Sequence, residues 1–160
     1  MRVKTILVPL DGSVLAESAL TPAVELARDH GARLMLLRAA EAHTFPMADP
    51  TEAQVQAVRA AEEYLAGVRL RLRQGGGDDI ESSVWYGPPA EAIVEAARFR
   101  RADLIVMSSH GRSGVGRLVL GSVAESVLRG SRVPILLIRP GDAPLDTPFT
   151  PATAKEIANV

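Results

Sequence analysis

Short runs of consecutive apolar residues alternate along this chain with longer stretches in which apolar residues recur every three or four positions. The runs are residues 6–10, 34–37, 80–86, 104–107 and 135–138. Runs that are apolar at nearly every position are typical of strands buried on both faces of a parallel sheet. The run over 80–86 includes three polar residues, Glu81–Ser83, and this favours a place at the edge of the sheet.

The stretches between these runs predict helices that bury one face. Their apolar stripes lie within residues 15–27, 55–72, 93–97 and 118–127. Pro22 should bend the first helix because it removes a backbone N–H. Thr51 is followed at capping-box spacing by a glutamine, Pro88–Pro89 suits the start of the third helix, and Gly130 suits the end of the fourth. Regular alternation of strand and helix predicts an α/β fold, a three-layer sandwich with right-handed crossovers.

Composition narrows the class of protein. The chain has 160 residues, of which 47% are hydrophobic and 23% charged, as expected for one ordinary domain. A formal net charge of −1 gives no basic surface for nucleic acid. The absence of cysteine excludes disulfides and thiol catalysis. No apolar run approaches the length of a signal peptide or a membrane span, so we expect a cytoplasmic protein that contacts no membrane.

We expect residues 1–140 to form a single domain. Residues 141–160 are rich in proline and predict a C-terminal tail that is flexible or contacts a partner.

A glycine-rich segment, SSHGRSGVGRLVLGS, follows the fourth apolar run at residues 108–122 and leads into a helix. Glycines let a ligand approach the backbone closely, and helix N-terminal N–H groups attract negative charge, so the segment predicts an anion site. It is not a Walker loop, because the only lysines of the chain are Lys4 and Lys155. It is not a dinucleotide fingerprint either, because Val119 stands where the third glycine should be. Both common phosphate motifs are therefore excluded.

A different spacing fits this segment. Gly111 and the pair Gly121–Ser122 are separated by nine residues, enough for the chain to leave a strand, pass around an anion and enter the helix. With these residues the sequence resembles the universal stress protein family, specifically its ATP-binding branch, over residues 3–139. The resemblance rests on ILVPLDGS after residue 5, GPPAEAIVEAA after residue 86, and above all ADLIVMSSHGRSGVGRLVLGSVAESVLRGSRVPILLIRP after residue 101.

The family's nucleotide signature reads G-x-x-G, nine residues, G-[S/T]. On this chain it falls on Ser108, Gly111, Gly121 and Ser122, and three of the four positions match. Ser108 replaces the first glycine, which would add a hydroxyl or crowd the phosphates if that position needs a positive φ.

The resemblance implies a Rossmann-like sheet of the adenine nucleotide alpha hydrolase type, with five parallel strands in order 3-2-1-4-5. In such a sheet the ligand binds where the strand order reverses, here between the first and fourth strands. It implies that the base lies near Pro9, Asp11 and Ala39. It implies that ribose and phosphates contact Met107, Ser108, Gly111, Gly121, Ser122 and Val123. His110 and Arg112 complete the predicted nucleotide site, the first by ordering the loop and the second by adding charge.

Several of these residues have a second interpretation. Asp11 could cap a helix, accept a hydrogen bond from the ligand, or hold magnesium through the nucleotide. Gly111 and Gly121 could serve turns and packing alone, and Ser122 could bond within its own helix. We predict no catalytic residue, because no Ser/His/Asp arrangement is legible around His110, and no metal site made by the protein alone. Trp85 and Tyr86 predict packing at the sheet edge, and the arginines at 69, 71 and 73 a solvated helix end.

The leading functional prediction is a stress-response regulatory protein that binds ATP with Mg2+, hydrolyses it slowly at most, and acts on an unidentified downstream protein. AMP or cyclic AMP would fit the same backbone donors. One alternative is an interaction protein that has the fold but binds no nucleotide. Another is an adenylating or pyrophosphatase-type enzyme, disfavoured because LDGSVLA follows the first strand in place of an SGGxDS loop.

The last apolar run predicts a contact between two copies of the chain. Val133–Arg139 would be an apolar strand at a sheet edge, and such edges pair with other strands. The resemblance implies a homodimer in which the two strands meet antiparallel. Pro134 removes one donor and would limit the extent of the pairing.

Overall fold

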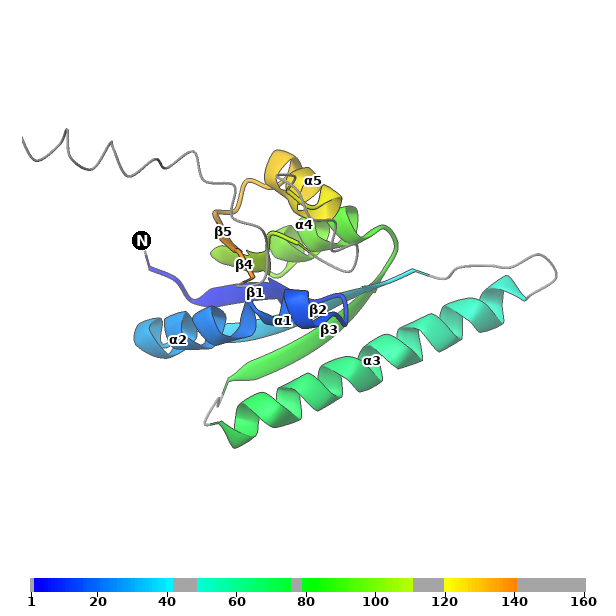
Figure 1. The fold of residues 1–160 in the computed structure, drawn as a ribbon, viewed down its shortest axis with the longest axis horizontal. Helices are drawn as coiled ribbons and strands as arrows, with labels where there is room; N and C mark the ends of the chain where they lie inside the picture. The colour runs from blue at the N-terminus through cyan, green and yellow to red at the C-terminus, as the bar shows by residue number, and fades with distance from the viewer. Residues whose placement is uncertain (1, 42–48, 76–78, 111–119, 141–160) are drawn as a thin grey trace, which may run out of the picture.

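The computed structural model describes residues 2–41, 49–75, 79–110 and 120–140. These residues form a five-stranded parallel sheet in the order β3-β2-β1-β4-β5, with helices on both faces (Figure 1). The predicted α/β fold and strand order are therefore confirmed. The strands are β1 (Thr5–Pro9), β2 (Arg33–Ala40), β3 (Ile80–Tyr86), β4 (Leu104–Ser108) and β5 (Ile135–Ile138), and the helices are α1 (Val14–Glu17), α2 (Leu20–His30), α3 (Pro50–Gln74), α4 (Pro89–Phe99) and α5 (Ser122–Gly130). The predicted tail, residues 141–160, lies outside the described residues.

Alternate residues of the central strands face two separate cores. Ile6 and Val8 of β1 pack with α1, α2 and α3 on one face, where Leu65 of α3 is fully buried. Leu7 packs with α4 and α5 on the other face, where Val127 is fully buried. The side chains of a strand alternate between faces, so a sheet covered on both sides needs apolar residues at every position. The continuous apolar runs of the sequence follow from this.

The more polar third run is at an edge of the sheet, as predicted. The residues of β3 are half-buried along most of their length, and its partner on the inner side is β2. Trp85 packs edge-on against Phe99 of α4, with 6.0 Å between ring centroids. The prediction that Trp85 serves packing at this edge is confirmed.

The first predicted helix is broken in two, and not merely bent. α1 ends at Glu17, and the hydroxyl of Ser18 donates to the carbonyl of Leu15 across 2.6 Å. α2 then starts at Leu20, so Pro22 falls in its first turn. The N–H groups of a first turn have no partner within the helix, so proline is tolerated there. The prediction of one bent helix was wrong because the chain breaks before the proline.

The start of the long helix α3 also differs from the prediction. Its N-cap is Asp49, whose Oδ1 accepts the N–H of Thr51 across 2.8 Å, and Pro50 is the first helical residue. The Asp-Pro pair provides both a cap and a fixed φ two residues before Thr51, so it determines the start. α4 begins at the Pro88–Pro89 pair, as predicted. None of the described helices is long and apolar enough to cross a membrane.

The hydrogen-bond ladders that join β1 to its neighbours, β2 and β4, end at different residues of β1. β1 pairs with β2 over its whole length, from Thr5 to Pro9, and the N–H of Leu10 continues the ladder to Leu37. Its ladder with β4 has only two pairs, at Ile6 and Leu7. Beyond Leu7, toward their carboxyl ends, β1 and β4 are no longer joined by ladder pairs. This is the point at which the strand order reverses, the usual position of a ligand in open α/β sheets.

Candidate functional site

A cavity of about 440 Å³ opens at the carboxyl edge of the sheet, next to the end of the ladder between β1 and β4. It brings together predicted site residues from three distant parts of the sequence. Those that line it are Pro9, Asp11, Ala39, Met107, Ser108, His110, Gly121, Ser122 and Val123. The predicted contacts Gly111 and Arg112 lie outside the described residues.

Backbone hydrogen bonds at Ser109 fix the end of the cavity near α5. Its N–H donates to the carbonyl of Ile138 at the end of β5 across 2.8 Å, and its carbonyl accepts the N–H of Gly121 across 2.9 Å. The N-cap of α5, Gly121, is thereby tied to the end of β4. The first N–H groups of α5 have no carbonyl partner within the helix, and the positive end of the helix dipole favours a negative group. This end of the cavity is suited to bind an anion.

Ser108, the departure from the family signature, is compatible with this site. It is buried, it is the last residue of β4, and its hydroxyl accepts the N–H of His110 across 3.3 Å. Among the described residues, the one non-glycine residue with a positive φ is Arg101, at 52°. Ser108 therefore has a backbone conformation open to any residue, and its side chain lines the cavity without strain.

His110 lies where the chain leaves β4. Its Nδ1 lies 2.9 Å from Oγ of Ser109, within hydrogen-bond distance, and the ring is half-buried at the cavity wall. This contact fixes the ring against its neighbour, consistent with the predicted ordering role. Within the described part of the chain, no group of three or more His, Cys, Asp or Glu residues could hold a metal ion.

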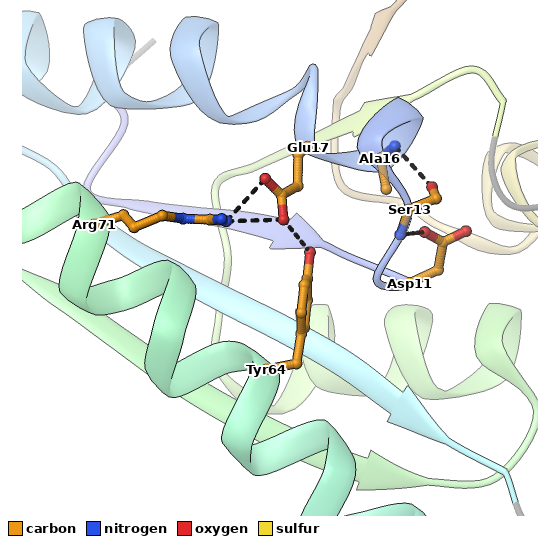
Figure 2. Close-up of polar contacts among 6 residues, drawn as sticks. All are labelled: Asp11, Ser13, Ala16, Glu17, Tyr64 and Arg71. Atoms are coloured by element: carbon orange, nitrogen blue, oxygen red, sulfur yellow. Dashed lines mark hydrogen bonds and ion pairs between the residues drawn. The ribbon is translucent and has the colours of Figure 1, made fainter.

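Asp11 lies in the turn between β1 and α1, at the cavity wall. Its Oδ1 accepts the N–H of Ser13 across 2.8 Å (Figure 2). Ser13 is the N-cap of α1, because its Oγ accepts the N–H of Ala16 across 3.1 Å. The interpretation of Asp11 as the helix cap is therefore wrong. The aspartate orders the turn that precedes the cap, and it also lines the cavity.

Apart from Ala39 of β2, the sequence did not identify the wall formed by α3 and β2. Ala57 and Ala60 of α3 line the cavity, together with Arg38 of β2 and with Pro89 and Ile93 of α4. The alanines leave space beside the sheet, and their spacing of three places them on one side of the helix. That spacing of small residues was the available signal. The packing of α3 on the sheet turned it into a wall.

A polar network joins this wall to α1. The hydroxyl of Tyr64 donates to Oε1 of Glu17 across 2.9 Å, and Nη2 of Arg71 lies 2.9 and 2.8 Å from the two carboxylate oxygens of Glu17 (Figure 2). Arg71 is 60% exposed, as predicted for a solvated helix end, and it also pairs with Glu17. Burial, followed by the hydrogen bond and charge of Glu17, raises the pKa of Tyr64 well above its usual range. The phenol therefore remains a donor to a higher pH than an ordinary tyrosine does.

The guanidinium of Arg38 lies over the ring of Tyr64, with 4.8 Å between Cζ and the ring centroid. This is a cation–π distance. A residue at the carboxyl end of β2 is thereby linked, through Tyr64 and Glu17, to helices α3 and α1.

The parallel sheet defines a Rossmann-like α/β protein, with a cavity at the reversal of strand order, where such folds usually bind ligands. A model of the universal stress protein family matches residues 2–139. The chain belongs to this family.

Sequence and structural relatives agree with this assignment. A protein of Staphylococcus aureus (strain USA300) that carries the universal stress protein name is 32% identical over 154 residues, which cover 94% of this chain and 92% of that protein. The universal stress protein UspA from Lactobacillus plantarum has a TM-score of 0.69 and 26% identity, over 87% of this chain and 99% of that one. A universal stress protein solved in complex with cAMP has a TM-score of 0.68 over 86% of this chain and 98% of that one. At 24% identity its likeness shows the shared fold.

Proposed function

We propose that this protein is an ATP-binding regulatory protein of the stress response, a dimer whose behaviour depends on the bound nucleotide. The observation that carries the proposal is one cavity with two chemically different ends. Backbone and hydroxyl groups at Ser108, Gly121 and Ser122 line the end at β4 and α5, and apolar residues such as Leu37, Ala39 and Ala57 line the end at β2 and α3.

The dimensions and chemistry of the cavity match a nucleotide. Its volume of about 440 Å³ lies within the range of about 300–1,000 Å³ of small-molecule pockets. The apolar end suits the faces of a planar base. The end at α5 suits phosphates, because N–H groups at a helix N-terminus and small residues let phosphate oxygens approach the backbone.

ATP with Mg2+ is the proposed ligand, and AMP and cyclic AMP are alternatives for the same donors. That a protein with this fold was solved in complex with cAMP supports a nucleotide as the class of ligand. Asp11 carries a carboxylate at the cavity wall, and like charges of a carboxylate and a triphosphate repel each other. A magnesium ion carried by the nucleotide would supply the positive charge between them.

Regulation fits this cavity better than rapid catalysis. His110, the described histidine at the cavity, has its Nδ1 bonded to Ser109, and we assign no general base among the described residues of the wall. Phosphoryl transfer needs a residue that orients the attacking water or hydroxyl. We therefore propose slow hydrolysis at most, in a protein that signals through an unidentified downstream partner.

The proposed dimer forms along Val133–Arg139. β5 is the last strand of the sheet, and an edge strand has unpaired N–H and C=O groups. Leu136 on this strand is 37% exposed. The bond from Ser109 to Ile138 joins the phosphate end of the cavity directly to β5. A nucleotide that moves the end of β4 would therefore act on the proposed dimer contact.

The test is a calorimetric titration of nucleotide-free protein with ATP and magnesium. We expect binding in the micromolar range and its loss in Gly121→Val, because valine places a branched side chain at the N-terminus of α5 in the cavity wall. Ser126→Val is the matched control, since Ser126 is exposed on the same helix and does not line the cavity. If the folded wild type binds none of ATP, AMP and cyclic AMP, the protein is an interaction module without a nucleotide.

A further inference from the structure

The wall of the cavity at β2 holds a positively charged side chain that the family signature does not include. Among the described residues that line the cavity, Arg38 is the only arginine or lysine. It lies at the carboxyl end of β2, beside Ala39 and across from Ala57 and Ala60 of α3. Two carboxylates, those of Asp11 and Glu41, also line the cavity. Burying a charged group, even in part, is costly unless the group is paired or hydrogen-bonded.

Gly12 packs against one face of this guanidinium. A Cβ at position 12 would lie 3.3 Å from Nη2, 3.4 Å from Cζ and 3.4 Å from Nη1 of Arg38. A point at nearly equal distances from these three atoms lies above the plane of the group and not at its edge. Gly12 also has a φ of +88°, so glycine at this position both makes the turn and leaves room for the guanidinium.

Tyr64 gives the guanidinium a second support. Its ring lies under Cζ of Arg38 at 4.8 Å, and its hydroxyl is held by Glu17, which is also bonded to Arg71. The ring therefore has little freedom to move away. Contacts over the plane of the guanidinium leave its N–H groups, which lie in that plane, available at the edges.

These N–H groups have no protein partner among the described residues. Arg38 donates no hydrogen bond and forms no ion pair there, although the side chain is half-buried. Arginine offers donors only, so its partner must present acceptor atoms. The phosphates have their own donors at the other end of the cavity, around Gly121 and Ser122.

We propose that Arg38 contacts the nucleoside half of the bound nucleotide and determines specificity by donating to acceptor atoms there. Purine ring nitrogens and ribose oxygens are such acceptors. Tyr64 is a positioning residue that holds the guanidinium plane. This inference rests on the proposed nucleotide site.

The test compares two ligands, ATP with magnesium and inorganic tripolyphosphate with magnesium, on the wild type and on Arg38→Met. Methionine keeps the length of the side chain and removes every donor. A hydrogen bond from a charged donor is worth roughly tenfold or more in affinity. We expect Arg38→Met to bind ATP about tenfold or more weakly than the wild type, and tripolyphosphate as the wild type does. Arg33→Met is the control, because Arg33 is on the same strand but exposed and paired with Asp79 and Glu81.

Each other outcome has its own meaning. An equal loss for both ligands would assign Arg38 to the phosphates or to the fold, and an unchanged ATP affinity would deny it any contact; either result overturns the inference while the nucleotide site stands. A wild type that binds neither ligand overturns the proposed function and this inference together.

Two variants of Tyr64 test whether its ring positions Arg38 or only stabilises the fold. Tyr64→Phe keeps the ring under Arg38, so we expect it to retain most of the ATP affinity. Tyr64→Leu removes the ring and should reproduce the loss of Arg38→Met for ATP alone. Equal ATP affinities for these two variants would overturn the positioning role of Tyr64.

Discussion

Tyr64 of α3 donates its hydroxyl to Glu17 of α1 across 2.9 Å, and this bond spans 47 residues of sequence. It joins the long helix α3 to the short helix α1, and both helices contribute residues to the wall of the cavity. The stability of this corner should therefore depend on the protonation of one phenol.

The first prediction concerns alkaline pH. The pKa of Tyr64 is raised by burial and then by Glu17, so above about pH 10, where an unfolded tyrosine ionises, the folded chain holds the extra proton. The stability from this group is complete below that pH and is lost as the pH rises toward the folded pKa. Urea unfolding at pH 9 and 11 should show a fall in stability that is smaller in Tyr64→Phe.

Tyr86 is the control for this experiment, because it is 52% exposed at the sheet edge and is the only other tyrosine of the chain. Tyr86→Phe should lose stability at alkaline pH as the wild type does. If Tyr64→Phe and the wild type have the same pH dependence, the hydrogen bond to Glu17 does not hold the phenol protonated in solution.

The second prediction concerns Gly12. Gly12→Ala forces a Cβ to within 3.3 Å of Arg38 at a φ of +88°, and we expect a loss of about 1–3 kcal/mol in the free energy of unfolding. Gly31→Ala has a φ of +60° but no heavy atom within 4 Å of the new Cβ, so it should lose less. Urea unfolding measures both. Equal losses would mean that the contact with Arg38 adds nothing to the backbone strain.

The third prediction tests the packing of α3 on the sheet, because this helix forms part of the cavity wall. Leu65 is 1% exposed and Leu70, on the same helix, is 60% exposed. Leu65→Ala should lower the free energy of unfolding by about 2–5 kcal/mol, because it removes buried contacts and leaves a cavity. Leu70→Ala should change it by roughly 0.5 kcal/mol or less. Thermal or urea unfolding of the two variants measures these changes. Equal losses of stability in Leu65→Ala and Leu70→Ala would disprove the packing of Leu65 in the core.

The fourth prediction tests the proposed dimer. The wild type should sediment at micromolar concentration with twice the mass of one chain, which is 17.0 kDa. Leu136→Arg should shift it to the monomer, because a charge on β5 opposes edge pairing. Leu70→Arg makes the same change at an exposed site on α3 and should stay dimeric. A monomeric wild type would exclude the contact along β5 under these conditions.

The sequence predicted the layers and the strands well because both depend on local patterns. Leu34–Leu37 is apolar at every position since its strand is covered on both faces, and the polar Glu81–Ser83 segment lies in an edge strand. Helix boundaries were less certain. The break before Pro22 and the cap at Asp49 depend on competition between neighbouring starts, each worth about 1 kcal/mol.

The chain by itself determined which residues meet at the reversal of strand order. The glycine segment and the turn at Asp11 follow strands whose carboxyl ends share one edge of a parallel sheet, so their proximity follows from the fold class. The wall formed by Arg38, Ala57 and Ala60 was decided only by tertiary structure. The angle and register with which α3 packs on β2 and β3 place the alanines at the cavity and Tyr64 beneath Arg38, and no local pattern in the sequence specifies that packing.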